Sequence, residues 1–208
     1  MYNVAIVGAG PAGIFAALEI MKLKPDWKVV LIEKGEKIEK RKCLLREGYE
    51  KCPTCKKCGL LCGWGGAGAF SDGKLTLTPD VGGHLVDYMS RKDAEDIIKY
   101  ADDLYLKFGA TEEVFGPDFK IFQELEHQAM LAELKLVHSP VRHLGTERSL
   151  DVLKHMQDYL DERITILNNV RAEKLKYNIE KQGATSVYIM KEDARRINDF
   201  FLFDQILL

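Results

Sequence analysis

Four cysteines stand at short, regular intervals in one segment of the chain. Cys52, Cys55, Cys58 and Cys62 follow a C-x2-C-x2-C-x3-C pattern, and Cys43 is the fifth cysteine in 208 residues. Such spacings are typical of thiolate ligands for an iron–sulfur cluster or for a structural zinc ion. Redox-active free thiols are a third alternative, because neighbouring lysines favour the thiolate. The pattern predicts metal or redox chemistry, with a 4Fe-4S cluster favoured over Zn.

Three glycines near the N-terminus have the G-x-G-x-x-G spacing of a dinucleotide-binding turn. Gly8, Gly10 and Gly13 follow the apolar run 3–7 and open a helical pattern from Pro11 to Leu23. The first glycine permits a tight turn, the second lets the backbone approach a pyrophosphate, and the third lets the helix pack close to the strand. We expect the helix to direct its N-terminal amides at phosphate groups.

A carboxylate ends the next apolar run. Glu33 follows residues 28–32 and lies twenty positions after Gly13. A carboxylate at this point accepts hydrogen bonds from an adenosine ribose and disfavours a ribose phosphate. Strand, glycines, helix, second strand and Glu33 together predict a dinucleotide site.

A second glycine-rich stretch follows the cysteines directly. Six glycines fall between Gly59 and Gly73, which is too dense for the interior of a helix or strand. A flexible linker is one alternative, but Trp64 and Phe70 are not linker residues. We therefore expect a loop whose backbone lies against a flat or phosphorylated ligand.

Composition limits the function classes. The chain is 46% hydrophobic and 30% charged, with a formal net charge of −2, which is ordinary for a globular protein. Near-neutral charge gives no reason to expect nucleic acid, and no apolar run reaches the length of a membrane span. The first residues lack a signal-peptide pattern, so we expect a cytoplasmic protein.

The elements that position these residues follow from apolar periodicity. We expect a doubly wound, Rossmann-like α/β fold with a helical insertion at residues 76–133. Ser90 is the expected cap between two helices in 80–108. The other expected helices are 118–133 and 147–160, the other strands are 134–143 and 164–167, and 171–178 with 184–190 form a hairpin around 181–183. The expected division is 1–75, 76–133, 134–190 and an atypical apolar tail at 191–208.

Two segments resemble known proteins. Val4 to Glu33 resembles the FAD-binding start of the two-domain flavoprotein oxidoreductases related to glutathione reductase. Cys62 to Leu75, reading CGWGGAGAFSDGKL, resembles a little-characterised prokaryotic group, the FAD-dependent dehydrogenases, and so does Val141 to Arg148. The resemblance covers about residues 2 to 190. It implies an FAD-binding domain that is C-terminally incomplete, because the family's later motifs do not occur in this chain.

The resemblance also implies which residues contact FAD. The glycine turn and Glu33 hold the ADP half, the loop from Gly65 to Lys74 borders the pyrophosphate and flavin, and the backbone at Asn169–Val170 touches adenine. Independently of the resemblance, most basic residues of 34–57 are expected to form a solvated face, and Arg41 with its neighbours is a candidate for a position near cofactor phosphate or near the thiolates. The full candidate set is Gly8, Gly10, Pro11, Ala12, Gly13, Glu33, Lys34, Arg41, Gly65, Gly66, Ala67, Gly68, Ser71, Lys74 and Val170, with Cys52, Cys55, Cys58 and Cys62 as metal ligands.

These features predict an enzyme, an FAD-dependent oxidoreductase that uses a small-molecule substrate or an electron-transfer partner. The alternative is a non-catalytic nucleotide-binding module, stapled by zinc, whose basic residues 34–57 contact a protein or nucleic acid. A third alternative is an inactive fragment whose apolar end promotes association.

Overall fold

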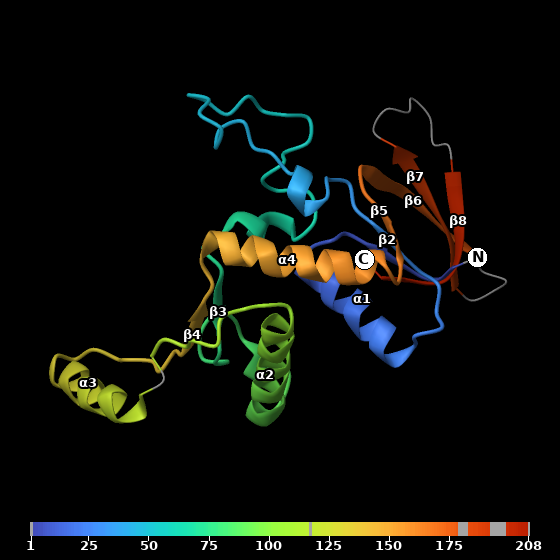
Figure 1. Cartoon of the computed structure of the whole chain (residues 1–208). Helices are drawn as coiled ribbons and strands as arrows, with labels where there is room; N and C mark the ends of the chain where they lie inside the picture. The colour runs from blue at the N-terminus through green and yellow to red at the C-terminus, as the bar shows by residue number, and fades with distance from the viewer. Residues whose placement is uncertain (1, 117, 179–182, 192–198, 208) are drawn as a thin grey trace. The chain divides into compact units, whose positions relative to one another are not determined.

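The protein folds into two compact units. The computed structural model describes residues 2–116, 118–178, 183–191 and 199–207. One unit comprises residues 1–70 and 153–208, and the other comprises residues 71–152. The chain is a mixture of helices and strands, and its main sheet lies in the first unit (Figure 1).

A six-stranded sheet forms the centre of the first unit. Its strand order is β5-β2-β1-β8-β7-β6. The first four strands in that order run parallel, and β8, β7 and β6 are joined by antiparallel pairs. The bounds are β1 Tyr2–Val7, β2 Val29–Ile32, β5 Thr165–Leu167, β6 Val170–Asn178, β7 Gly183–Lys191 and β8 Asp199–Leu207.

The core sits where β1 and β2 meet their helix. All four residues of β2 are buried, as a strand covered on both faces of a parallel sheet requires. Helix α1 (Pro11–Leu23) buries one face against the strands through Ile14, Ala17, Leu18 and Met21. Pro at the first position is pre-organised for a helix start because its missing N–H is not needed there. The α/β fold with a parallel sheet, predicted from the sequence, is confirmed.

The C-terminal segment differs from expectation. Residues 191–208 were expected to form an atypical tail, but Asp199–Leu207 is strand β8, which pairs in parallel with β1 in the register Ala5 with Ile206. The paired residues lie about two hundred positions apart in the sequence, so no local pattern could reveal the pairing. The expected hairpin is present as β6 and β7, and its turn at residues 179–182 lies outside the described residues.

The second unit contains a small sheet and two helices. Strand β3 (Lys74–Thr76) pairs antiparallel with β4 (Val141–His143), which is shorter than the strand expected at 134–143. Pro140 lacks the N–H that a longer ladder needs at that point. Because β3 and β4 pair, this unit spans 71–152 rather than the 76–133 expected for the insertion.

Side-chain caps define both helices of the second unit. Helix α2 (Arg91–Lys107) starts after Ser90, whose Oγ accepts from the amide of Asp93, as the sequence predicted. Helix α3 (Phe119–Leu131) starts after Asp118, which accepts from two amides of the first turn. The last helix, α4 (Gly145–Asp161), begins in this unit and ends in the first. Among the helices of the described residues, each is too short or too polar to cross a membrane.

Candidate functional site

The glycine turn joins the carboxyl end of β1 to α1. Gly8 has a φ of +103°, a conformation that side chains disfavour, and its amide bonds the carbonyl of Ile32 at 2.8 Å. A Cβ on Gly13 would overlap the carbonyl oxygen of Gly8, so only glycine allows the helix to pack this closely. A Cβ on Gly10 would meet no atom within 4 Å. The turn is therefore closed at Gly13 and open at Gly10, where the first helical amides lack intrahelical partners.

Glu33 is buried and bonded to three backbone amides. Only 6% of its surface is exposed. Its Oε2 accepts from the amide of Ala9 at 2.8 Å, and its Oε1 accepts from Gly35 at 2.7 Å and from Gly63 at 2.9 Å. A carboxylate has about four acceptor positions, so one on Oε2 is left for a ligand. Glu33 thus ties three segments together, a role beyond the ribose contact that the sequence predicted.

Arg41 holds the glycine-rich loop through its carbonyls. Arg41 is 6% exposed, and its guanidinium carbon lies over the Phe70 ring, 4.8 Å from the ring centroid. Burial lowers the pKa of Arg41 from its ordinary value, and the charges of Glu33, Cys62 and Cys58 oppose that shift. Its N–H groups donate to the carbonyls of Gly59, Leu60, Gly63, Trp64 and Gly66 at 2.6 to 3.5 Å. Arg41 therefore organises the loop, and its donors are directed at protein carbonyls.

The glycine-rich loop lies directly against the glycine turn. The amide of Gly65 donates to the carbonyl of Ala9 at 2.8 Å. A Cβ on Gly66 would lie 3.2 Å from the Cα of Gly10, and Gly66 has a φ of +64°. The short 3-10 helix Gly66–Phe70 starts here, and its residues Ala67 and Gly68 are exposed. Two glycine segments, far apart in the sequence, thus meet beside the start of α1.

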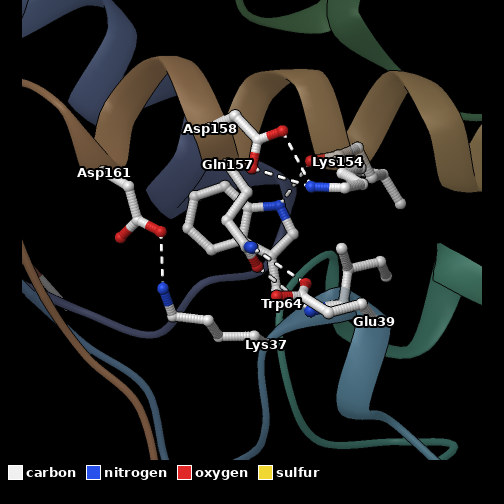
Figure 2. A network of polar contacts seen from close by, with 9 residues as sticks. Lys37, Glu39, Trp64, Lys154, Gln157, Asp158 and Asp161 are labelled. Carbon is white, nitrogen blue, oxygen red and sulfur yellow. Dashed lines mark hydrogen bonds and ion pairs between the residues drawn. The ribbon is translucent and has the colours of Figure 1, made fainter.

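The end of α4 anchors the entry to this loop (Figure 2). Trp64 is fully buried, and its Nε1 donates to the carbonyl of Leu153 at 2.8 Å. Gln157 is 1% exposed, accepts from the amide of Ile38 at 3.0 Å and donates to Glu39 at 3.1 Å. Burial raises the pKa of Glu39, but hydrogen bonds from its own backbone and from Gln157 outweigh burial, so the pKa lies below its ordinary value.

Backbone hydrogen bonds fix the segment Asn169–Val170, which the sequence predicted to lie beside the adenine of FAD. Asn169 has a φ of +58°, and its amide donates to the carbonyl of Gly35 at 3.0 Å. Val170 is 4% exposed, and its amide donates to the carbonyl of Glu33 at 3.0 Å. The side chain of Asn169 contacts Glu36 at 2.8 Å and also Lys57, which comes from the cysteine-rich segment. The carboxyl ends of β1, β2 and β5 therefore meet the cysteine-rich segment at one edge.

The remaining predicted FAD contacts lie elsewhere. Lys34 is exposed beside Glu33. Ser71 and Lys74 belong to the second unit, where Ser71 Oγ accepts from the amide of Gly73 and Lys74 pairs with Asp72 at 2.8 Å. The role of Ser71 and Lys74 as FAD contacts therefore stays a prediction.

The four cysteines do not converge. Cys52 and Cys55 are exposed, and Cys58 and Cys62 are half-buried. In the part of the chain that the structure describes, no group of three or more His, Cys, Asp or Glu side chains is arranged to hold a metal ion. The amide of Cys62 donates to the carbonyl of Cys58 at 2.8 Å, so these two are one helical turn apart. The arrangement does not support the predicted four-thiolate centre.

Sequence reasoning missed the residues that build the scaffold of the site. Trp64 and Gln157 anchor the loop, and Lys57 and Glu36 contact the side chain of Asn169, for which the sequence predicted only a backbone role. Each acts through a partner distant in sequence. Only Trp64 carried a signal, a large apolar residue within a glycine-rich run.

Sequence comparison gives one partial relative. No family model matches the chain. A stretch of 71 residues is 42% identical to an uncharacterized protein of Clostridium beijerinckii, and it covers 34% of this chain and 13% of that protein. The chain thus spans a small part of that relative.

Solved structures share the fold. A 3-ketosteroid dehydrogenase from Rhodococcus jostii matches with a TM-score of 0.53 and 12% identity, covering 98% of this chain and 44% of that one. An L-amino acid deaminase from Proteus vulgaris matches at 0.50 and 11%, covering 99% and 46%. The quinol fumarate reductase of E. coli matches at 0.50 and 14%, covering 99% and 32%. The chain spans less than half the length of each, and the likeness is one of fold.

Proposed function

We propose that this chain is the FAD-binding part of an FAD-dependent oxidoreductase. The observation that carries the proposal is the open backbone at Gly10, where a strand end, a helix start and the glycine-rich loop meet. Amides at a helix N-terminus favour a phosphate group, and a glycine there lets the phosphate approach. The redox activities named for the dehydrogenase and the reductase that share the fold support the same class.

The residues present fit FAD. Gly8, Gly10 and the first turn of α1 would hold the pyrophosphate, because that backbone is open and its amides are available. The free acceptor position on Glu33 Oε2 would take a ribose hydroxyl. Gly65 and Gly66 would border the same phosphates, and the backbone at Asn169–Val170 would lie beside adenine.

The chemistry divides between cofactor and protein. FAD, when bound, supplies hydride or electron transfer. The described residues bind and orient it: Glu33 and Arg41 fix the loop backbone, and buried Trp64 keeps that loop packed against α4. The four cysteines do not fit a metal centre as arranged, so no electron transfer step is assigned to them. The residues that bind the substrate would lie outside this FAD site or would come from a partner protein.

The test is FAD binding by matched glycine variants. We expect the purified chain to bind FAD, seen as quenching of flavin fluorescence. Gly10→Ala should weaken binding about tenfold or more, because its methyl group would occupy the approach path of the pyrophosphate. The variant should unfold at the same denaturant concentration as the wild type, since the added Cβ meets no protein atom within 4 Å.

Gly83→Ala is the control, because a Cβ there also meets nothing within 4 Å and the position lies in the second unit. It should change neither stability nor FAD affinity. A folded wild-type chain that does not bind FAD would contradict the proposed function.

A further inference from the structure

Cys58 and Cys62 lie on a single helical turn that has little room to move. The amides of Leu61 and Cys62 both donate to the carbonyl of Cys58, at 3.1 and 2.8 Å. A Cβ on Gly59 would overlap the carbonyl oxygen of Lys42, so the turn packs directly against the backbone after Arg41. Both thiols are half-buried, whereas Cys52 and Cys55 are exposed. We expect a group added to either half-buried sulfur to displace part of this turn, because the neighbouring backbone at Gly59 has no free space toward Lys42.

Arg41 connects the turn to the glycine-rich loop. Its Nε and Nη2 donate to the carbonyls of Gly59 and Leu60, inside the turn, at 3.0 and 2.8 Å. Its Nη1 donates to Trp64 and Gly66, inside the loop, at 2.6 and 2.8 Å. The planar guanidinium cannot serve both sets of carbonyls if the turn shifts relative to the loop.

Glu33 connects the end of the turn to the nucleotide site. Gly63 directly follows Cys62, and its amide donates to Glu33 Oε1 at 2.9 Å. The other oxygen of the same carboxylate accepts from Ala9 in the glycine turn at 2.8 Å. A Cβ on Gly63 would lie 2.7 Å from Arg41 Cδ, so Gly63 is in close contact with Arg41 as well as bonded to Glu33. Arg41 and Glu33 are thus the two side chains that link the turn of Cys58 and Cys62 to the glycine-rich loop and to the dinucleotide turn.

We propose that Cys58 and Cys62 form a thiol-modification site that controls nucleotide affinity through Arg41 and Glu33. The inference rests on the proposed function, because the nucleotide is FAD. Modification shifts the turn, strains the carbonyl contacts of Arg41 and moves the carboxylate that fixes Ala9. By linkage, a bound nucleotide shifts the thiol–disulfide equilibrium of the two cysteines toward the thiols by the same factor by which their oxidation weakens nucleotide binding.

A small-molecule disulfide is the natural reagent for such a pair. The thiolate of one cysteine attacks the disulfide RSSR, forming a protein–S–S–R bond and releasing one RSH after protonation. The thiolate of the second cysteine then attacks the sulfur of the first cysteine in this mixed disulfide, which breaks the S–SR bond and releases the other RSH after protonation. The two protein thiols are oxidised to one disulfide, and RSSR is reduced to two RSH. In a helical turn the Cβ atoms of residues i and i+4 lie about 5–6 Å apart, farther than the about 3.5–4.5 Å that a disulfide spans, so closing this bond requires the turn to distort.

The first measurement is the alkylation rate of each cysteine with N-ethylmaleimide, followed by peptide mass spectrometry with and without saturating FAD. We expect FAD to slow the reaction of Cys58 and Cys62 about fivefold or more, because bound FAD suppresses the local opening of the turn that exposes these thiols. Cys52 and Cys55 serve as internal controls, because they lie on the exposed part of the same segment and should react at unchanged rates.

The second measurement is FAD affinity before and after treatment with oxidised glutathione. Treatment of the wild type should weaken binding about fivefold or more. The variant C52S/C55S should show the same ratio of affinities, and C58S/C62S should show a ratio near one. If the latter variant does not fold, the alkylation rates of the wild type still decide the question.

The outcomes separate this inference from the proposed function. The inference would be overturned, and the function left standing, if FAD binds but does not change the alkylation rates of Cys58 and Cys62. The same holds if FAD slows Cys52 and Cys55 as much as Cys58 and Cys62. Failure of the untreated chain to bind FAD would overturn both.

Discussion

At the scale of single residues, two buried charges of opposite sign hold the same loop in complementary ways. Glu33 accepts from the amide of Gly63, whereas Arg41 donates to carbonyls on either side of it. A loop with this many glycines has large conformational entropy when unfolded, so it needs such contacts to adopt one structure. The charges also attract each other, which offsets part of the cost of burying them.

Replacing Arg41 with lysine tests this role. Arg41→Lys should destabilise the protein by about 2–3 kcal/mol, because a lysine ammonium cannot serve five carbonyls in a planar fork. The measurement is the urea concentration at the midpoint of unfolding, compared between variants whose denaturant slope m is the same. Arg46→Lys is the matched control, since Arg46 stacks on the same Phe70 ring but is exposed, with one bond at 3.4 Å. Equal effects of the two substitutions would show that Arg41 does not organise the loop.

At the scale of elements, a buried ion pair joins a helix to a strand in the second unit. Arg142 of β4 forms two bonds with Asp102 of α2, at 2.6 and 2.7 Å, and its side chain is 5% exposed. A further bond reaches the carbonyl of Thr111 at 2.5 Å. The hydrogen bonds that Arg142 donates to Asp102 raise the pKa of Arg142, so the guanidinium stays charged. This pair fixes a small sheet that otherwise has few partners.

Asp102→Asn should therefore cost about 3–5 kcal/mol, because it leaves the charge of Arg142 buried without a counter-charge. Asp103→Asn provides the comparison one residue away. Asp103 is exposed and pairs with Lys99 in an i,i+4 contact of little net value, so its loss should change stability by about 0.5 kcal/mol at most. Guanidinium-induced unfolding followed by circular dichroism measures both. A small effect at Asp102 would mean that α2 and β4 are held by other contacts.

At the scale of the whole molecule, the C-terminal strand completes the parallel sheet. β8 pairs with β1 on the side opposite to β2. Without it, the strand that leads into the glycine turn would become an exposed edge, which is prone to association. The apolar end of the sequence is therefore part of the first unit.

A chain ending at residue 191 should lose its cooperative thermal unfolding transition and should elute from a sizing column as larger species. A chain ending at residue 207 should behave as the full protein, since β8 ends at Leu207. Circular dichroism and size-exclusion chromatography measure the two properties. A monomeric, cooperatively folded protein after the longer deletion would show that β8 is dispensable.

The sequence by itself determined the local elements of the nucleotide site. The β1–α1–β2 unit was predicted within a residue at each end, because burial on both faces gives β2 its unbroken apolar run and the glycines punctuate the start of α1. The cap at Ser90 and the hairpin of β6 and β7 followed from equally local signals. Hydrophobic period and turn chemistry act over a few residues, and a sequence displays them directly.

Only the tertiary structure decided which distant segments meet. It placed Gly65 against Ala9, assigned the donors of Arg41 to backbone carbonyls, and left Cys52 and Cys55 exposed while Cys58 and Cys62 are half-buried. It also turned an apolar tail into β8. These outcomes depend on contacts between residues far apart in the sequence, where neither spacing nor composition indicates the partner. The sequence identifies the candidate functional residues, but only the tertiary structure shows which residues they contact.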